Sequence, residues 1–186
     1  KNIVNIWRNV VKNQLRALDV KDLFDFYDFN YLIEERVLSI RQEVLSGGYQ
    51  IDKPLIFKVE KKLGICRHLI IPQPNDALIM QIITESIVFK IKKRQPSQNA
   101  FYARDTYIFN KNKFDSDTEY GVNWLVQWKN MQKKIYKFNE GKNLLVVTDL
   151  SNYFDSIDLS MLRESILSMT KCEDQVLIDL LFRIIE

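Results

Sequence analysis

Residues 142–164 read Lys-Asn-Leu-Leu-Val-Val-Thr-Asp-Leu-Ser-Asn-Tyr-Phe-Asp-Ser-Ile-Asp-Leu-Ser-Met-Leu-Arg-Glu and decide the fold that we expect. The apolar, β-branched run Leu144–Val147 follows Gly141 and ends at a polar cluster, which predicts a buried strand. Asp149 comes directly after this run. A carboxylate at the carboxyl end of a buried strand lies at the rim of a sheet, where oxygen ligands can hold a hard metal ion.

Asp149 has a second interpretation, as the cap of the helix that follows, because Asp is a common N-cap residue. Asp158 and Ser160 lie closer to the start of that helix and would cap it better. We therefore favour metal binding for Asp149 and helix capping for one of the other two residues.

The composition predicts a folded protein with a polyanionic partner. The chain has 186 residues, 46% hydrophobic and 12% aromatic, enough for one large domain or two small ones. Residues 51–104 hold ten basic and four acidic side chains, a net charge of +6, whereas the rest of the chain carries −3. A basic segment beside an acidic site is typical of proteins that bind polyanions.

Other features of the sequence concern the compartment. Cys66 and Cys172 match no metal-ligand spacing, which indicates a reducing environment without a disulfide framework. The sequence contains no apolar run of roughly 18 residues and no signal peptide, so we expect a cytoplasmic protein without a membrane partner. The chain opens on Lys1 and ends on Glu186 inside an apolar-periodic run, which predicts an excised piece of a longer protein.

Periodicity predicts a helix-rich chain with one hairpin. The two β-rich runs Leu55–Val59 and Ile65–Ile71, with Gly64 at the tip between them, predict the hairpin. Residues 97–117 are the least regular and could include a strand near 102–109. Helices are expected over 2–18, 31–45, from Pro74 or Asn75 to the residues before Pro96, over 118–138 and 158–170, and from about Glu173.

The expected hairpin carries Lys61 and Lys62 near its turn and Arg67 on its second strand. Such a hairpin suits a triphosphate, because Arg can hold phosphate oxygens bidentately and Lys acts as a point charge. The alternative is an exposed hairpin with solvated charges. His68, the only histidine, alternates with Arg67 and is expected on the opposite face.

The segment from Asp149 to Ile157, Asp-Leu-Ser-Asn-Tyr-Phe-Asp-Ser-Ile, resembles the first catalytic palm motif of bacterial reverse transcriptases, a branch that includes group II intron, retron and defence-associated enzymes. The resemblance implies that Asp149 and the Leu150 main-chain carbonyl bind two Mg²⁺ ions. It also implies that Phe154 lies against the sugar of the incoming nucleotide and excludes ribonucleotides. From the residues alone, core packing is the stronger interpretation of Phe154.

A second segment, from Lys61 to Pro72, resembles the fingers motif of the same family, with Asp76 and Gln81 downstream. The resemblance assigns triphosphate binding to Arg67 and to Lys61 or Lys62. The chain departs from the pattern where many members have an Asp-Arg pair, because Ala77 follows Asp76.

A third, looser resemblance covers Gln95–Arg104 and concerns a family segment that touches template and nucleotide. It implies that Ser97, Phe101 and Arg104 bind nucleotide or template. Ala100 stands where the family has glycine. Aromatics interleaved with basic residues suit stacking on single-stranded bases, and they equally suit a packed surface loop.

The resemblance covers residues 30–170 and implies an α+β fold, the fingers and partial palm of a right-hand polymerase. The expected domains are an N-terminal helical extension (1–46), fingers (47–139) and the first part of a palm (140–186). The implied protein is an RNA-directed DNA polymerase, a magnesium-dependent nucleotidyltransferase. Its partners would be deoxynucleoside triphosphates, an RNA template, a DNA or RNA primer and, in some members, a non-coding RNA. The long helix over 118–138 and Ala77 favour the anti-phage, abortive-infection type.

The family's second metal-binding motif, an aromatic residue, any residue and an Asp-Asp pair, does not occur in these 186 residues. We therefore expect this chain alone to be inactive as a polymerase. A nucleic-acid-binding protein with a degenerate, non-catalytic palm remains an alternative. A nucleotidyl cyclase is a weaker one, because cyclases need no basic hairpin to grip a template.

Overall fold

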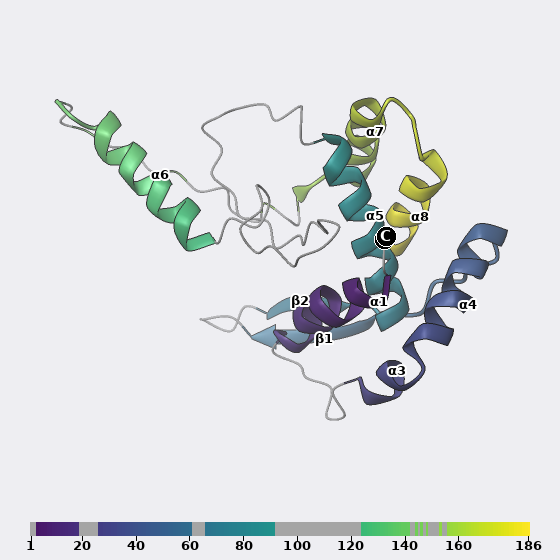
Figure 1. Ribbon diagram of the computed structural model, residues 1–186. Coiled ribbons are helices and arrows are strands. Elements are labelled where there is room, and N and C mark those ends of the chain that lie inside the picture. The colour runs from purple at the N-terminus through teal and green to yellow at the C-terminus, as the bar shows by residue number, and fades with distance from the viewer. Residues whose placement is uncertain are drawn as a thin grey trace. The chain divides into compact units, whose positions relative to one another are not determined.

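The computed structural model describes residues 3–18, 26–60, 66–91, 124–141, 144, 146, 148, 153 and 156–186. The described helices and strands are labelled in Figure 1, and the chain divides into two compact units. The first unit comprises Lys1–Ile87 and Asp174–Glu186, and the second comprises Val88–Glu173. The fold is α+β and rich in helices, as expected. The division into an extension, fingers and palm stays a prediction.

The first helical segment consists of α1 (Ile3–Ile6), η1 (Trp7–Val11) and α2 (Lys12–Arg16). The sequence predicts one helix over 2–18, and the described part confirms it, since the residues at both joints have right-handed helical backbone angles. The middle is a π-helical turn, in which the Lys12 N–H donates to the Trp7 carbonyl, five residues back.

The π turn explains the one exception in the apolar stripe of this helix. Gln14 interrupts the stripe when the positions are counted as a regular α-helix. In the structure Gln14 is exposed and Leu15 is buried. A π turn holds more residues than an α turn, so it shifts the residues after it around the helix axis. Leu15 thereby joins Ile6, Trp7 and Val10 in the core.

Trp7 lies at the centre of this core, where α1 and α3 (Tyr27–Tyr31) pack against α4 (Ile33–Ser46). Its ring lies against Phe29, with 4.1 Å between the centroids, and meets the edge of Phe26 at 5.9 Å. Its Nε1–H donates to the Asn30 Oδ1 at 2.7 Å. The indole therefore buries its apolar surface without leaving its one donor unpaired.

Helix α4 ends where the sequence predicts. Gly47 has a φ of 73°, a left-handed conformation that glycine adopts without steric cost. The Gly48 N–H donates to the Glu43 carbonyl and the Gly47 N–H to the Val44 carbonyl, which is the Schellman arrangement. The two glycines thus satisfy carbonyls that the helix would leave unpaired.

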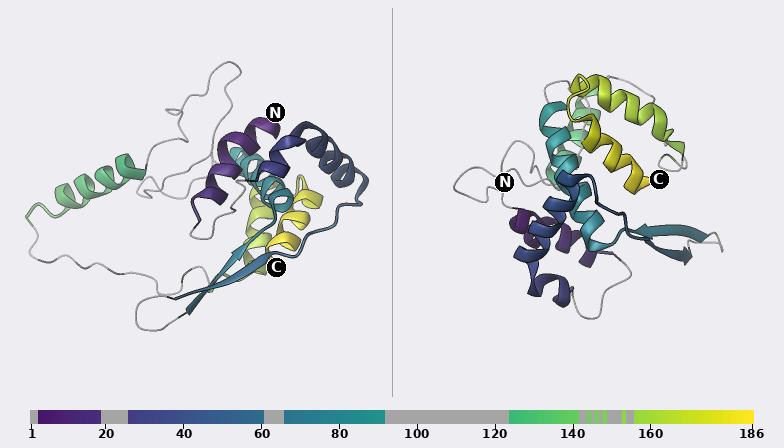
Figure 2. Two further views of the ribbon diagram at one scale, coloured as in Figure 1. Left: turned by 90° about the horizontal axis from the view of Figure 1, so that it is seen from below. Right: turned by 90° about the vertical axis from the view of Figure 1, so that its right-hand side faces the viewer.

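The predicted hairpin is confirmed. Strand β1 (Leu55–Glu60) pairs with β2 (Cys66–Ile71) in antiparallel register from Leu55 opposite Ile71 to Glu60 opposite Cys66. Figure 2 shows the two strands side by side as a twisted ribbon. Pro72 and Gln73 then connect β2 to α5 (Pro74–Ile91).

The first unit also contains most of α5 and helix α8 (Gln175–Ile185). Proline is suited to the first position of a helix, because its missing N–H would have no partner there, and α5 begins at Pro74 as predicted. Both helices bury apolar side chains: Leu78, Ile79, Ile83 and Ile87 on α5, and Ile178, Leu181 and Phe182 on α8.

The second unit contains the end of α5, α6 (Trp124–Phe138) and α7 (Leu159–Thr170). Asp158 caps α7, since its Oδ1 accepts a hydrogen bond from the Met161 N–H at 3.0 Å. This confirms the sequence-based expectation. The start predicted for α6, at residue 118, lies outside the described residues.

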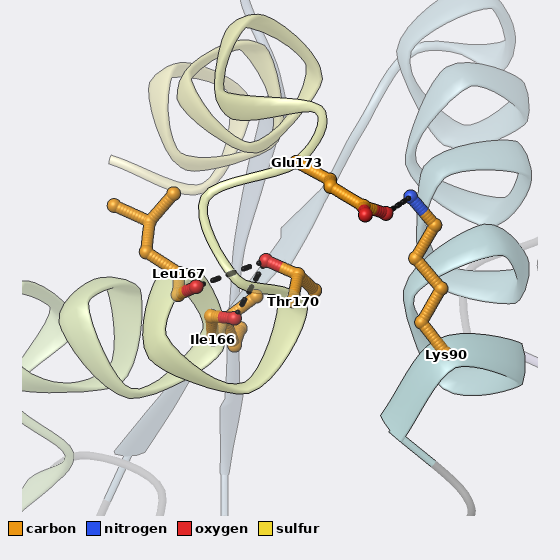
Figure 3. Close-up of polar contacts among 5 residues, drawn as sticks. All are labelled: Lys90, Ile166, Leu167, Thr170 and Glu173. Carbon is orange, nitrogen blue, oxygen red and sulfur yellow. Dashed lines mark hydrogen bonds and ion pairs between the residues drawn. The ribbon is translucent and has the colours of Figure 1, made fainter.

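Beyond the end of α7, an ion pair joins Lys90 Nζ to Glu173 Oε2 at 3.1 Å (Figure 3). The Thr170 hydroxyl donates to the carbonyl of Ile166 at 2.9 Å and to that of Leu167 at 3.2 Å. Lys90 belongs to the basic segment that we expect to face a polyanion, and here its charge is directed at a carboxylate instead. It is therefore a poorer candidate for phosphate binding than its position in the sequence suggests.

The predicted buried strand over Leu144–Val147 is not found at the positions that the structure describes. Leu144 is 79% exposed and Val146 is 73% exposed, and neither they nor Thr148 belongs to a strand. Residues 145 and 147 lie outside the described residues. The prediction of a buried strand is therefore not borne out at these positions. Apolar, β-branched composition favours a strand, but burial needs a partner against the strand face.

Trp7→Ala should lower the free energy of unfolding by about 3–5 kcal/mol, because it leaves a cavity and removes the partner of Asn30. Urea denaturation followed by circular dichroism measures this change. Arg8→Ala is the control: Arg8 is exposed next to Trp7, and its removal should cost less than about 0.5 kcal/mol. Equal effects of the two substitutions would contradict the central place of Trp7 in the core.

Candidate functional site

The hairpin β1–β2 is the part of the expected site that the structure describes best. Arg67 belongs to β2, and its main chain pairs with Val59 on β1. Lys58 lies opposite His68, and both side chains are exposed. On β2, His68 and Ile70 are exposed whereas Leu69 and Ile71 are more buried, so the alternation expected of a strand is present.

The other residues expected at the site lie outside the described residues. These are Asp149, Leu150 and Phe154 of the palm motif, Lys61 and Lys62 of the hairpin, and Ser97, Phe101 and Arg104. The side chain of Arg67 is also outside them. The structure therefore neither brings these groups together nor separates them, and their roles stay predictions.

A buried carboxylate holds the base of the hairpin. Asp76, in the first turn of α5, is 1% exposed. Its Oδ1 accepts a hydrogen bond from the Tyr49 hydroxyl at 2.8 Å, and its Oδ2 accepts one from the Asp52 main-chain N–H at 3.1 Å. Tyr49 and Asp52 lie between α4 and β1, so these bonds tie the entry to the hairpin to the helix that follows it.

Burial shifts the titration of this cluster. Desolvation raises the pKa of Asp76 above its ordinary value of 3.8, while the hydrogen bonds from Tyr49 and from the Asp52 N–H oppose that rise. The pKa of Tyr49 is also raised, first by burial and then by its hydrogen bond to Asp76 and the nearby negative charge. Tyr49 therefore remains a hydrogen-bond donor at neutral pH.

The sequence points to Asp76 only through the fingers motif, where it is the downstream Asp, and gives no sign of its partner Tyr49. The downstream Gln of the same motif, Gln81, donates its Nε2–H to the Glu85 Oε1 at 3.1 Å, one turn further along α5. Both motif positions thus make hydrogen bonds that stabilise the helix next to the hairpin. A signal for the Tyr49–Asp76 pair would have required knowledge of the fold, since 27 residues separate the two.

The described residues also bear on metal binding and on membrane insertion. Within them, no three His, Cys, Asp or Glu side chains form a group that could hold a metal ion. Asp149 is outside this set, so its expected Mg²⁺ role stays a prediction. None of the described helices combines the length and the apolar character needed to cross a membrane.

No protein-family model matches the chain, and no curated protein or solved structure shows a significant similarity to it. The likeness to reverse transcriptases therefore rests on the two motifs and their order in the sequence.

Tyr49→Phe should lower the free energy of unfolding by about 1.5–3 kcal/mol, because it leaves a buried carboxylate oxygen without its donor. Urea denaturation at pH 7 measures the loss. Tyr31→Phe serves as the matched control, since Tyr31 is 72% exposed, and it should change stability little. A Tyr49→Phe protein as stable as the control would show that the hydrogen bond contributes nothing.

Asp76→Asn should remove the contribution of Asp76 to the pH dependence of the free energy of unfolding. A raised pKa in the folded state means that the contribution of Asp76 is fully present below pH 3.8 and is lost as the pH rises through the raised value. Asn does not titrate, so the variant should gain stability relative to the wild type as the pH rises across this window. Urea denaturation at several pH values checks the sign. If the difference in free energy of unfolding between the variant and the wild type is constant with pH, or if the variant loses stability relative to the wild type as the pH rises, the pKa of Asp76 is not raised.

Proposed function

We propose that this chain carries the nucleotide-binding fingers and the first metal-binding segment of an RNA-directed DNA polymerase of the bacterial, defence-associated kind. The observation that carries the proposal is the order and spacing of two motifs, the basic Lys61–Pro72 segment and the Asp149–Ile157 segment. Either motif alone would be weak support.

The structure adds support to one half of this proposal. The first motif begins in the residues between two paired strands and continues along β2 into the connection to α5. A two-stranded ribbon that starts from the buried Asp76 cluster (Tyr49, Asp52 and Asp76) gives basic residues a firm base. A phosphate-binding group must be held in place to act, because a mobile charge loses much of its binding energy to ordering.

The proposed chemistry assigns a separate task to each residue. Arg67, with Lys61 or Lys62, holds the triphosphate, and Phe154 excludes a nucleotide with a 2′-hydroxyl. Asp149 and the Leu150 carbonyl are oxygen donors of the type that Mg²⁺ prefers. When bound, the metal supplies electrostatic stabilisation of the phosphoryl transfer. The remaining carboxylates of such a site are not among these residues, since the sequence has no Asp-Asp pair.

A second candidate is a nucleic-acid-binding protein that keeps the fingers without the chemistry. The two candidates share the expectation of polyanion binding, and affinity should fall steeply as salt concentration rises in both. They differ in whether Asp149 matters to any reaction.

Asp149→Asn separates the two candidates, because it keeps the shape of the side chain and removes the charge that would bind the metal. In the full-length protein, primer extension on an RNA template with deoxynucleoside triphosphates should fall at least about 100-fold. Binding of the template and primer should change little.

Glu164→Gln is the matched control, since it removes one negative charge from an exposed position on α7. It should extend primers at the wild-type rate. If Asp149→Asn also does so, Asp149 binds no catalytic metal. If the wild type binds RNA and extends nothing, the non-catalytic candidate is correct.

A further inference from the structure

A cavity of about 520 Å³ opens within the first unit, and none of the described residues that line it has a role in the proposed polymerase site. We call it the Arg36 cavity. Its volume falls within the range of about 300–1,000 Å³ that is usual for small-molecule sites. Its apolar wall includes Leu15 and Leu18 at the end of the first helical segment, Phe26 and Phe29 around α3, and Phe57 and Ile71 on the hairpin.

Arg36 on α4 supplies the cation of this cavity. Its Cζ lies 5.4 Å from the centroid of the Phe29 ring, so the ring contacts one face of the guanidinium. Its Nε is buried and, within the described part of the chain, has no hydrogen-bond partner. A buried donor without a partner is costly, and because Nε is closed to solvent, a ligand in the cavity would meet the rest of the guanidinium.

Two carboxylates also line the cavity, those of Asp28 and Asp52. Both side chains are exposed, whereas Arg36 is half-buried. Neither Asp makes an ion pair with the guanidinium among the interactions of the described residues. The cavity is thus lined by one half-buried positive group, two exposed negative groups and several apolar side chains.

This combination of groups selects for a particular kind of ligand. A simple anion would gain from Arg36 but would be repelled by the two carboxylates. A simple cation would gain from the carboxylates but would be repelled by the charge of Arg36. A ligand with both charges and an apolar body satisfies all three groups and covers the wall.

We propose that the Arg36 cavity binds a small zwitterion of amino-acid or dipeptide size with an apolar or aromatic side chain. Its carboxylate pairs with the guanidinium of Arg36, its side chain contacts Phe26, Phe29 and Phe57, and its ammonium group lies near Asp28 and Asp52. This site is independent of the proposed polymerase function. It places a small-molecule site between the N-terminal helices and the base of the hairpin.

Three probes with one aromatic body test the role of each charge. L-Tryptophan carries both charges, N-acetyl-L-tryptophan carries only the carboxylate, and L-tryptophanamide carries only the ammonium group. Titrations of the full chain, followed by NMR chemical shifts, should show that L-tryptophan binds about tenfold or more tightly than either of the others. Shifts should concentrate at residues that line the cavity. Binding of all three with equal affinity, or of none, would overturn the proposal.

Variants locate the site and need no knowledge of the natural ligand. Arg36→Gln should weaken L-tryptophan and N-acetyl-L-tryptophan by about tenfold and leave L-tryptophanamide unchanged. Arg36→Lys keeps the charge but loses the planar fork, so it should fall between wild type and Arg36→Gln. Asp28→Asn combined with Asp52→Asn should weaken only the two probes with an ammonium group.

Arg41→Gln is the matched control, because it removes the same charge from an exposed position on the same helix. It should bind all probes as the wild type does. If Arg36→Gln folds and binds L-tryptophan as tightly as Arg41→Gln, the cavity is not the binding site. If Arg36→Gln does not fold, the comparison of the three probes on the wild type still decides whether the protein recognises both charges of the ligand.

Discussion

The Asp76 carboxylate accepts hydrogen bonds from the Tyr49 hydroxyl and the Asp52 main-chain N–H, and the position of the hairpin depends on this contact. A carboxylate that is 1% exposed is unfavourable unless its oxygens are satisfied. Here the two donors come from the segment before β1 and the acceptor from the helix after β2. The segment before β1 and the helix after β2 are thus joined to each other, and the two ends of the hairpin are held at the same place.

Local patterns in the sequence predict the described elements well. Periodic apolar residues locate the first helical segment, α4, α5 and α7, the double glycine ends α4, and the two β-rich runs form a hairpin. Each signal acts over a few residues, which is why sequence alone carries it. The π turn and the Tyr49–Asp76 hydrogen bond depend on packing between segments, and no local pattern predicts them. Leu144 and Val146 show the opposite case, a strong strand pattern without burial, because a pattern cannot supply the partner that a strand face needs.

The structure describes only a part of the expected polymerase site. The hairpin that bears Arg67 is described by the structure, whereas Asp149 and Phe154 are known only as positions in a motif. The motif predicts the roles of these residues but not their positions in space. The Arg36 cavity is the reverse case, since the structure describes residues that line it but no sequence pattern predicts it. Arg36, Asp28 and Asp52 are ordinary surface-type residues in an amphipathic context, and only the fold shows that they line one space.

The π turn in the first helix has a consequence for how this sequence can diverge. The five residues Trp7–Val11 set the rotation between α1 and α2, and each residue step along an α-helix turns by about 100°. Loss of one residue there would convert the π turn into an α turn and keep Leu15 on the core side, whereas gain of one residue would move Gln14 into the place of Leu15. The segment should therefore tolerate the loss of one residue better than the gain of one. Among related sequences, a spacing between Trp7 and Leu15 that is shorter by one residue would indicate a regular α-helix with the same core face.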